Sequence, residues 1–173
     1  MKVEITNTLL KYTVKHPQRL QSVLETASAL TSIADVPAGR KEQTVNIILV
    51  GEKRIRRLNK EFLRHDYPTD VIAFTYHVDE VSVYEQDADD EVEDDALFGE
   101  LFVCPGVAEK RRYRYKTSLS YEILLYIVHG MLHLAGYDDD TETRRAEIKA
   151  VEGEVMNKLT TQYEIDDLFM KRR

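Results

Sequence analysis

Two histidines and an aspartate late in the chain have the spacing of a metal site. His129 and His133 are followed by Gly136 and Asp139 in the pattern H-x-x-x-H-x-x-G-x-x-D. Residues four apart lie on one face of a helix with Cβ atoms about 5–6 Å apart, so both imidazoles can reach one ion at about 2.0–2.1 Å. Gly136 is expected to end the helix and turn the chain back, which offers Asp139 as a third ligand. Three protein ligands leave a position open for water, as catalytic metal sites do.

The third ligand and the ion are less sharply defined by the residues. Spacing favours Asp139, by analogy with zinc hydrolases whose third ligand lies six residues past the second histidine. Its neighbours Asp138 and Asp140 are alternatives, and all three are also compatible with solvated turn carboxylates. Two histidines and a carboxylate suit Zn²⁺, although Fe²⁺ or Mn²⁺ can use the same donors. The competing interpretation is that both histidines are hydrogen-bonded core side chains without a metal.

One residue within the motif argues against a peptidase. Gly130 stands where H-E-x-x-H proteases carry the glutamate that serves as general base. A peptidase built on this motif would need a base from elsewhere in the chain, so the peptidase interpretation is disfavoured.

The helix that carries the histidines is expected to be buried. Between about residues 119 and 134, apolar side chains cover almost its whole circumference. A buried imidazole needs polar partners, and a metal together with a hydrogen-bond acceptor behind the ring would supply them. Ser118 or Ser120 can cap the start of this helix, and Gly136 stands at its C-terminal cap position.

The remaining pattern predicts an α+β fold, a small mixed β-sheet of about four strands covered by about five or six helices. The chain is expected to form one domain over residues 1–173, and its C-terminal Lys171-Arg-Arg173 is expected to be frayed. Strands are predicted at 3–7, 44–50, 71–76 and 97–103, and further helices from the His16-Pro17 pair onward, at 52–63, at 106–115 and at 141–159.

The composition fits a globular protein with an uneven distribution of charge. Hydrophobic residues make up 43% of the 173 residues, and no apolar run is long enough to span a membrane. The first residues lack the apolar region of a secretory signal, and Cys104 is the only cysteine, so a cytoplasmic location is expected. Residues 79–95 hold ten acidic side chains and no Lys or Arg, so that without them the net charge of −7 becomes +3. This acidic segment is expected to be a solvated loop.

A basic run with two tyrosines is a candidate RNA-binding segment. Lys and Arg can neutralise phosphates, and Tyr113 and Tyr115 can stack on unpaired bases. The competing interpretation is a solvated helix end, and the second cluster, Lys53-Arg54-Ile-Arg56-Arg57, is interpreted as an ordinary helix surface. The candidate RNA-binding residues are Lys110, Arg111, Arg112, Arg114 and Lys116.

The motif and its flanking segments resemble the YbeY family of bacterial endoribonucleases and rRNA maturation factors. The matching residues run in order from 58 to 139: Leu58-Asn59-x-x-Phe62, Asp66-Tyr-Pro68-Thr69-Asp70-Val71-Ile-Ala-Phe74, Phe98-Gly99-Glu100-Leu101-Phe102-Val103 and His129-Gly-x-Leu132-His133-Leu-x-Gly136-Tyr137-Asp138. The resemblance implies a compact α+β fold, one zinc ion per chain and cleavage of single-stranded RNA. It also implies a role in small-subunit rRNA maturation and ribosome quality control, with rRNA, the ribosome or its small subunit, and assembly factors as partners.

Two positions depart from the family pattern. The family's third ligand is usually a histidine, and Asp139 stands there in this chain. The family's arginine after the aromatic residue of the Leu-Asn motif is replaced by Leu63, and Arg64 follows one residue later as the candidate catalytic residue. Two other functions remain open at this point: a metallopeptidase-like hydrolase, and a non-catalytic ribosome assembly factor whose metal is structural.

Overall fold

The computed structural model describes residues 1–33, 43–76 and 96–172. The predicted acidic loop at 79–95 lies outside the described residues. The elements follow the chain as β1 (Lys2–Asn7), β2 (Tyr12–Val14), α1 (Pro17–Leu30), β3 (Gln43–Leu49), α2 (Glu52–Leu63), β4 (Val71–Thr75), β5 (Ala96–Val103), α3 (Pro105–Tyr115), α4 (Leu119–Leu134), α5 (Glu142–Gln162) and β6 (Phe169–Lys171). No helix among these residues is long and apolar enough to cross a membrane.

The four main strands form one mixed sheet in the order β1-β3-β5-β4. β1, β3 and β5 are parallel, and β4 joins β5 antiparallel at the edge, with Ala73 opposite Leu101. The predicted α+β class with a small mixed sheet is confirmed, and five helices accompany it in the described part of the chain.

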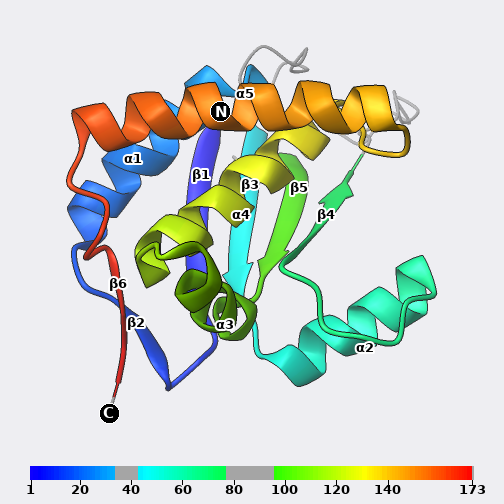
Figure 1. Ribbon diagram of the computed structural model, residues 1–173, viewed down its shortest axis with the longest axis horizontal. Coiled ribbons are helices and arrows are strands. Elements are labelled where there is room, and N and C mark those ends of the chain that lie inside the picture. The colour runs from blue at the N-terminus through cyan, green and yellow to red at the C-terminus, as the bar shows by residue number, and fades with distance from the viewer. Residues whose placement is uncertain (34–42, 77–95, 173) are drawn as a thin grey trace, which may run out of the picture.

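The helices lie on both faces of this sheet, but unequally. The main core lies between the sheet and helices α1, α4 and α5, and includes Ile47, Leu101, Ile127 and Met131. α5 packs against α1 and α4 (Figure 1). A smaller apolar cluster that includes Ile55 lies between the opposite face and α2. The edge strand β4 therefore has the histidine-bearing helix on one side and α2 on the other.

Helix α4 begins and ends as its sequence predicts. The Ser118 side chain accepts a hydrogen bond from the Tyr121 N–H at 2.9 Å, so Ser118 and not Ser120 is the cap. At the other end Gly136 has a positive φ of 94°, and the Tyr137 N–H donates to the Leu132 carbonyl at 3.0 Å. This turn reverses the chain directly after His133 and brings residues 137–140 back toward the helix.

The prediction that the C-terminal residues are frayed is wrong for residues 171 and 172. β2 and β6 form a second, two-stranded antiparallel sheet, with Val14 opposite Phe169. Lys171 ends β6, and the Arg172 N–H donates to the Lys11 carbonyl at 2.8 Å. Residues 171 and 172 are therefore paired and not frayed, because a strand from the start of the chain supplies hydrogen-bond partners that lie far away in sequence.

Candidate metal centre

The three predicted ligands meet at the C-terminal end of α4. The Nε2 atoms of His129 and His133 are 3.0 Å apart, and one donor atom from each of His129, His133 and Asp139 lies within 4.8 Å of the other two. The helix supplies the two imidazoles, and the turn at Gly136 returns the carboxylate to them. The side chains thus have the arrangement that the spacing predicts for a shared ion.

Each imidazole is oriented by a partner behind its ring. Nδ1 of His129 is hydrogen-bonded to the Glu152 carboxylate from α5, and Nδ1 of His133 lies 3.0 Å from the Tyr137 carbonyl oxygen. A ring that donates through Nδ1 keeps an unprotonated Nε2, which is the form that binds metals. The two Nε2 atoms are 3.0 Å apart, which is close enough for both to bind one ion at about 2.0–2.1 Å. The donor set therefore fits a divalent ion.

The turn geometry separates the three consecutive aspartates. Asp138 and Asp140 both accept hydrogen bonds from the Arg144 guanidinium, at 3.2 and 3.0 Å. Arg145 donates to the backbone carbonyl of Asp139 at 3.0 Å, so the Asp139 side chain is not used to hold the turn. This arrangement favours Asp139 over its neighbours as the third ligand.

Charge around His129 favours a cation. Burial alone lowers the pKa of His129, but the hydrogen bond and the negative charge of Glu152 outweigh it. Asp70 and Asp139 add to the effect, and the pKa of His129 is raised above its ordinary value. The same negative potential would stabilise a bound metal ion.

Gly130 faces the sheet and not the ligands. A Cβ atom at this position would lie 2.8 Å from Leu101 Cδ2 and 3.1 Å from Val71 Cγ2. The helix approaches β4 and β5 so closely here that a larger side chain has no room. A glutamate in the position used by H-E-x-x-H proteases would therefore crowd the core side chains of Leu101 and Val71.

An open hollow of about 410 Å³ lies beside the turn that follows α4. It follows the end of α4 and is lined by Ala135, Gly136, Tyr137, Asp138, Arg144 and Glu147. Because Tyr137 is also the residue whose carbonyl orients His133, the hollow is continuous with the turn that positions the ligands.

The structure does not bring Arg64 into contact with the predicted ligands. Arg64 is the exposed C-terminal cap of α2 with a left-handed φ of 63°, and α2 covers the opposite face of the sheet from α4. Among the described residues, the Arg64 guanidinium makes no hydrogen bond or ion pair. Its neighbour Leu63 ends α2 and is 51% exposed.

The predicted basic run forms the second half of α3 and is partly neutralised. Lys110 bonds to Glu52 at 2.6 Å, Arg111 lies 3.7 Å from Asp70, and Arg112 lies 3.5 Å from Glu109. Arg114 and the helix cap Lys116 have no carboxylate partner within the part of the chain that the structure describes.

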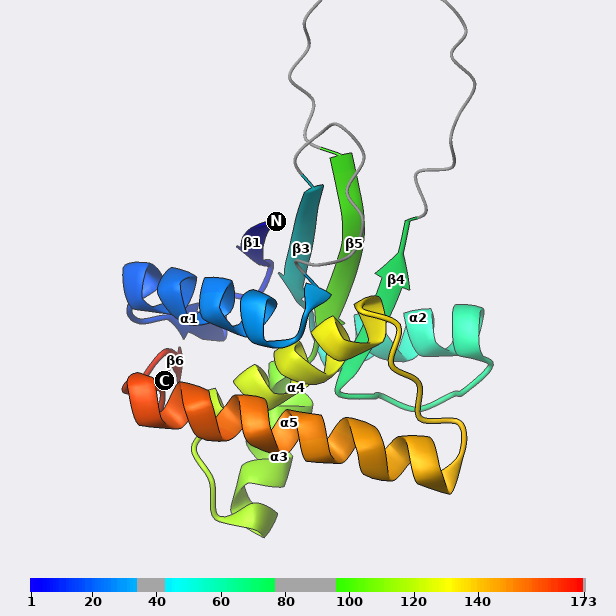
Figure 2. The ribbon, with the colours of Figure 1, turned by 90° about the horizontal axis from the view of Figure 1, so that it is seen from above.

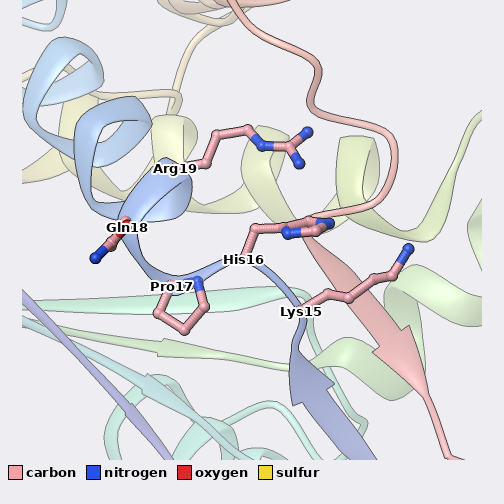
Figure 3. A pocket seen from close by; sticks show the side chains of 5 residues that line it. All are labelled: Lys15, His16, Pro17, Gln18 and Arg19. Atoms are coloured by element: carbon pink, nitrogen blue, oxygen red, sulfur yellow. The ribbon is translucent and has the colours of Figure 1, made fainter.

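A second hollow, of about 430 Å³, lies at the start of α1 and is lined by Lys15, His16, Pro17, Gln18 and Arg19 (Figure 3). Its three basic side chains all bind Asp167, at 3.1, 2.9 and 3.0 Å. Hydrogen bonds from Lys15 and His16 lower the pKa of Asp167 to about 2. The cations are thus used to attach the C-terminal segment to α1.

Sequence reasoning did not identify Glu152, Tyr137 or Arg144 as part of this centre. Glu152 is 23 residues from His129, on a helix whose position depends on tertiary packing. No local pattern marks it. Tyr137 contributes its backbone carbonyl, which any residue would offer. Arg144 binds Asp138 and Asp140 because the turn brings the three side chains together, and the sequence alone does not show this turn geometry.

Comparisons with known proteins point to one family. A family model described as endoribonuclease YbeY matches residues 4–160. A protein of Elusimicrobium minutum named endoribonuclease YbeY is 40% identical over 119 residues, which cover 69% of this chain and 76% of that protein. A protein of the same name from Heliobacterium modesticaldum is 31% identical over 143 residues, covering 79% and 81% of the two chains. The match to the Thermotoga petrophila protein, at 37% identity, spans 59% of this chain and 57% of that one.

A solved structure extends the likeness to most of the fold. The solution structure of TM1509 from Thermotoga maritima superposes with a TM-score of 0.52 at 25% sequence identity, and covers 92% of this chain and 93% of its own. The residues of the family match include strands β2 to β5, helix α4 and all three candidate ligands. The chain therefore belongs to the endoribonuclease YbeY family.

Proposed function

We propose that this protein is a zinc-dependent endoribonuclease that cleaves single-stranded RNA in the maturation of small-subunit rRNA and in ribosome quality control. The observation that carries the proposal is the convergence of His129, His133 and Asp139, with both imidazoles oriented by partners at Nδ1. Membership of a family named for RNA cleavage supports the substrate class. The partners would be rRNA, the ribosome or small subunit and its assembly factors, in the cytoplasm.

The residues of the centre have different proposed roles. His129, His133 and Asp139 would hold one Zn²⁺, which when bound lowers the pKa of water or polarises a phosphoryl oxygen. Glu152 holds His129 in the metal-binding form, and the Tyr137 carbonyl does the same for His133. The open hollow beside the Gly136 turn would offer an RNA strand room next to the residues that follow the ligands in the chain.

Cations would bind the RNA backbone and stabilise charge on the phosphate. Arg114 and Lys116 have no carboxylate partner among the described residues. Lys110 and Arg111 are half or more exposed and their ion pairs cost little to break, whereas Arg112 pairs with the largely buried Glu109. Arg64 is the proposed stabiliser of the developing negative charge. Because it caps the end of α2, on the other face of the sheet from α4, an RNA strand that reaches it must pass around the edge strand β4.

The experiment that tests the proposal measures metal and cleavage together. We expect His133→Ala to lose bound zinc in elemental analysis and to lose cleavage of single-stranded RNA. His16→Ala is the matched control, because the side chain of that histidine binds Asp167 beside α1, and its loss should leave both measurements unchanged. Full cleavage by metal-free His133→Ala protein would end the proposal.

A further inference from the structure

Aromatic side chains gather on the surface where α2 ends. Phe62 and Tyr67 are each 56% exposed, and His65 between them is exposed as well. We call these three residues the α2 aromatic cluster. Single exposed apolar residues need no explanation, but three exposed rings within six residues form a patch of the kind that marks a binding surface.

These rings are held in place without being buried. The Phe62 ring meets Phe74 of β4 edge-on, with centroids 4.9 Å apart. His65 and Tyr67 stack nearly parallel, with centroids 5.4 Å apart and 16° between the ring planes. The loop beneath them is fixed by the buried Asn59, whose amide donates to the Tyr67 carbonyl at 2.8 Å. Rings fixed in this way lose little entropy when a flat ligand stacks on them.

The charge around the cluster is positive. Residues 52–67 contain six Lys and Arg side chains against three carboxylates. Glu52 is occupied by Lys110, and Asp66 is shared by Arg56 and Lys60. Arg57 and Arg64 have no carboxylate partner within the described residues, so the rings are accompanied by cations that are free to bind phosphates.

The cluster and the metal centre lie on the two sides of one edge strand. Phe74 of β4 supports the Phe62 ring on the outer face, and Val71 of the same strand packs against Gly130, beside His129, on the inner face. In Figure 2, α2 and the C-terminal end of α4 flank β4. A flexible strand that crosses the edge at β4 can reach both.

From this juxtaposition we infer that the α2 aromatic cluster is a base-stacking platform for unpaired bases of the RNA strand whose phosphate is presented to the metal centre. The inference rests on the proposed function and adds the place where bases are held. Flat exposed rings beside unpaired cations match the bases and the phosphates of single-stranded nucleic acid. Such a platform gives single-strand specificity, because bases within a duplex are already stacked and paired and have no face to offer.

The test separates bases from backbone. Binding of an oligouridylate is compared with binding of an abasic oligomer of the same length and charge, by fluorescence anisotropy with the full chain, and cleavage during the measurement is checked on a gel. The wild-type protein should bind the oligouridylate more tightly. Tyr67→Leu and Phe62→Leu should weaken that binding by about 5- to 100-fold per ring and leave binding of the abasic oligomer unchanged.

Ring-keeping variants are the matched controls. Tyr67→Phe and Phe62→Tyr preserve the stacking face and should bind as the wild-type protein does. The thermal unfolding temperature of all four variants should match that of the wild-type protein, since the rings are exposed. If Phe62→Leu proves unstable, the binding result of Tyr67→Leu decides the test.

Three outcomes would overturn the inference. Equal binding of both oligomers by the wild-type protein would leave RNA binding intact and reject stacking. Unchanged oligouridylate binding by the leucine variants, together with loss of binding to ribosomal subunits, would reassign the cluster to a protein contact. Binding of neither oligomer by the wild-type protein would reject the proposed function itself. This outcome is measured on the wild-type protein and does not depend on the ring variants.

Discussion

His129 and Glu152 are joined by a hydrogen bond between Nδ1 and a carboxylate oxygen, and this contact attaches the histidine-bearing helix α4 to α5. Both side chains are largely withdrawn from solvent, with 25% and 16% of their surface exposed. A carboxylate behind a metal-binding imidazole fixes the ring and increases its basicity. The long helix α5 therefore has a part in the candidate centre although it supplies no ligand.

Removal of this carboxylate should weaken the metal site without abolishing it. For Glu152→Ala we expect a loss of zinc affinity of about 10- to 100-fold, because the His129 ring loses its orientation and its tautomer is no longer fixed. Zinc competition with a chromophoric chelator measures the change. Glu154→Ala is the control, since Glu154 is exposed on the same helix and makes no ion pair among the described residues. Equal affinities for the two variants would contradict the role given to Glu152.

Metal binding should depend on pH through His129. Because Glu152 raises the pKa of His129, the ring takes up a proton at a higher pH than an ordinary imidazole. A protonated Nε2 has no lone pair, so zinc affinity should fall as the pH decreases through this raised pKa. In the metal-free protein the charged pair acts in the opposite sense: its stabilisation is fully present below the pKa of the unfolded state and is lost as the pH rises through the folded-state value.

Calorimetric zinc titrations over a pH series check this dependence. Glu152→Gln removes the negative charge and keeps a hydrogen-bonding group, so the fall in zinc affinity should move to lower pH. A fall at the same pH in both proteins would show that His129 does not control it.

The third ligand gives a prediction about rate. Asp139→Asn should lose most of the bound zinc, whereas Asp138→Asn and Asp140→Asn should keep it, because those two carboxylates bind Arg144. Asp139→His places a neutral donor at the same point of the turn, which leaves more positive charge on the ion. We expect this variant to keep zinc and to cleave single-stranded RNA faster at saturating substrate. Zinc loss from Asp138→Asn instead would move the ligand assignment by one residue.

The parts of this centre that the sequence predicts are those whose residues lie close together in the chain. His129, His133, Gly136 and Asp139 lie within eleven residues, and helix geometry with one glycine turn is enough to place them. The bounds of α2 and α4 were likewise predicted, and Ser118 was one of two predicted caps, because periodicity and capping are local properties. Glu152 and the β2–β6 pairing were not, because each joins segments that only the folded core brings together.

The direction of the Arg64 side chain is a case where the local sequence pattern is misleading. Its place one residue after Leu63 suggested a substitute for the family's arginine, and a shift of one residue turns a side chain by about 100° around a helix. The structure ends α2 at Leu63 and puts Arg64 in the left-handed cap, so its direction is set by the turn and not by the helix. Its catalytic role stays a prediction, which Arg64→Ala kinetics can address.

Gly130 offers a prediction about stability with an internal control. Gly130→Ala adds a Cβ within 2.8 Å of Leu101 in the buried contact between α4 and the sheet, so the free energy of unfolding should decrease by about 1–3 kcal/mol. Gly153→Ala adds the same atom to α5, where nothing lies within 4 Å, and should stabilise the protein by about 0.4–1 kcal/mol. Urea unfolding of the two variants measures both changes. A stabilised Gly130→Ala protein would mean that α4 does not approach β4 and β5 as closely as the structure has it, and the exclusion of a protease-type glutamate from this helix would lose its physical basis.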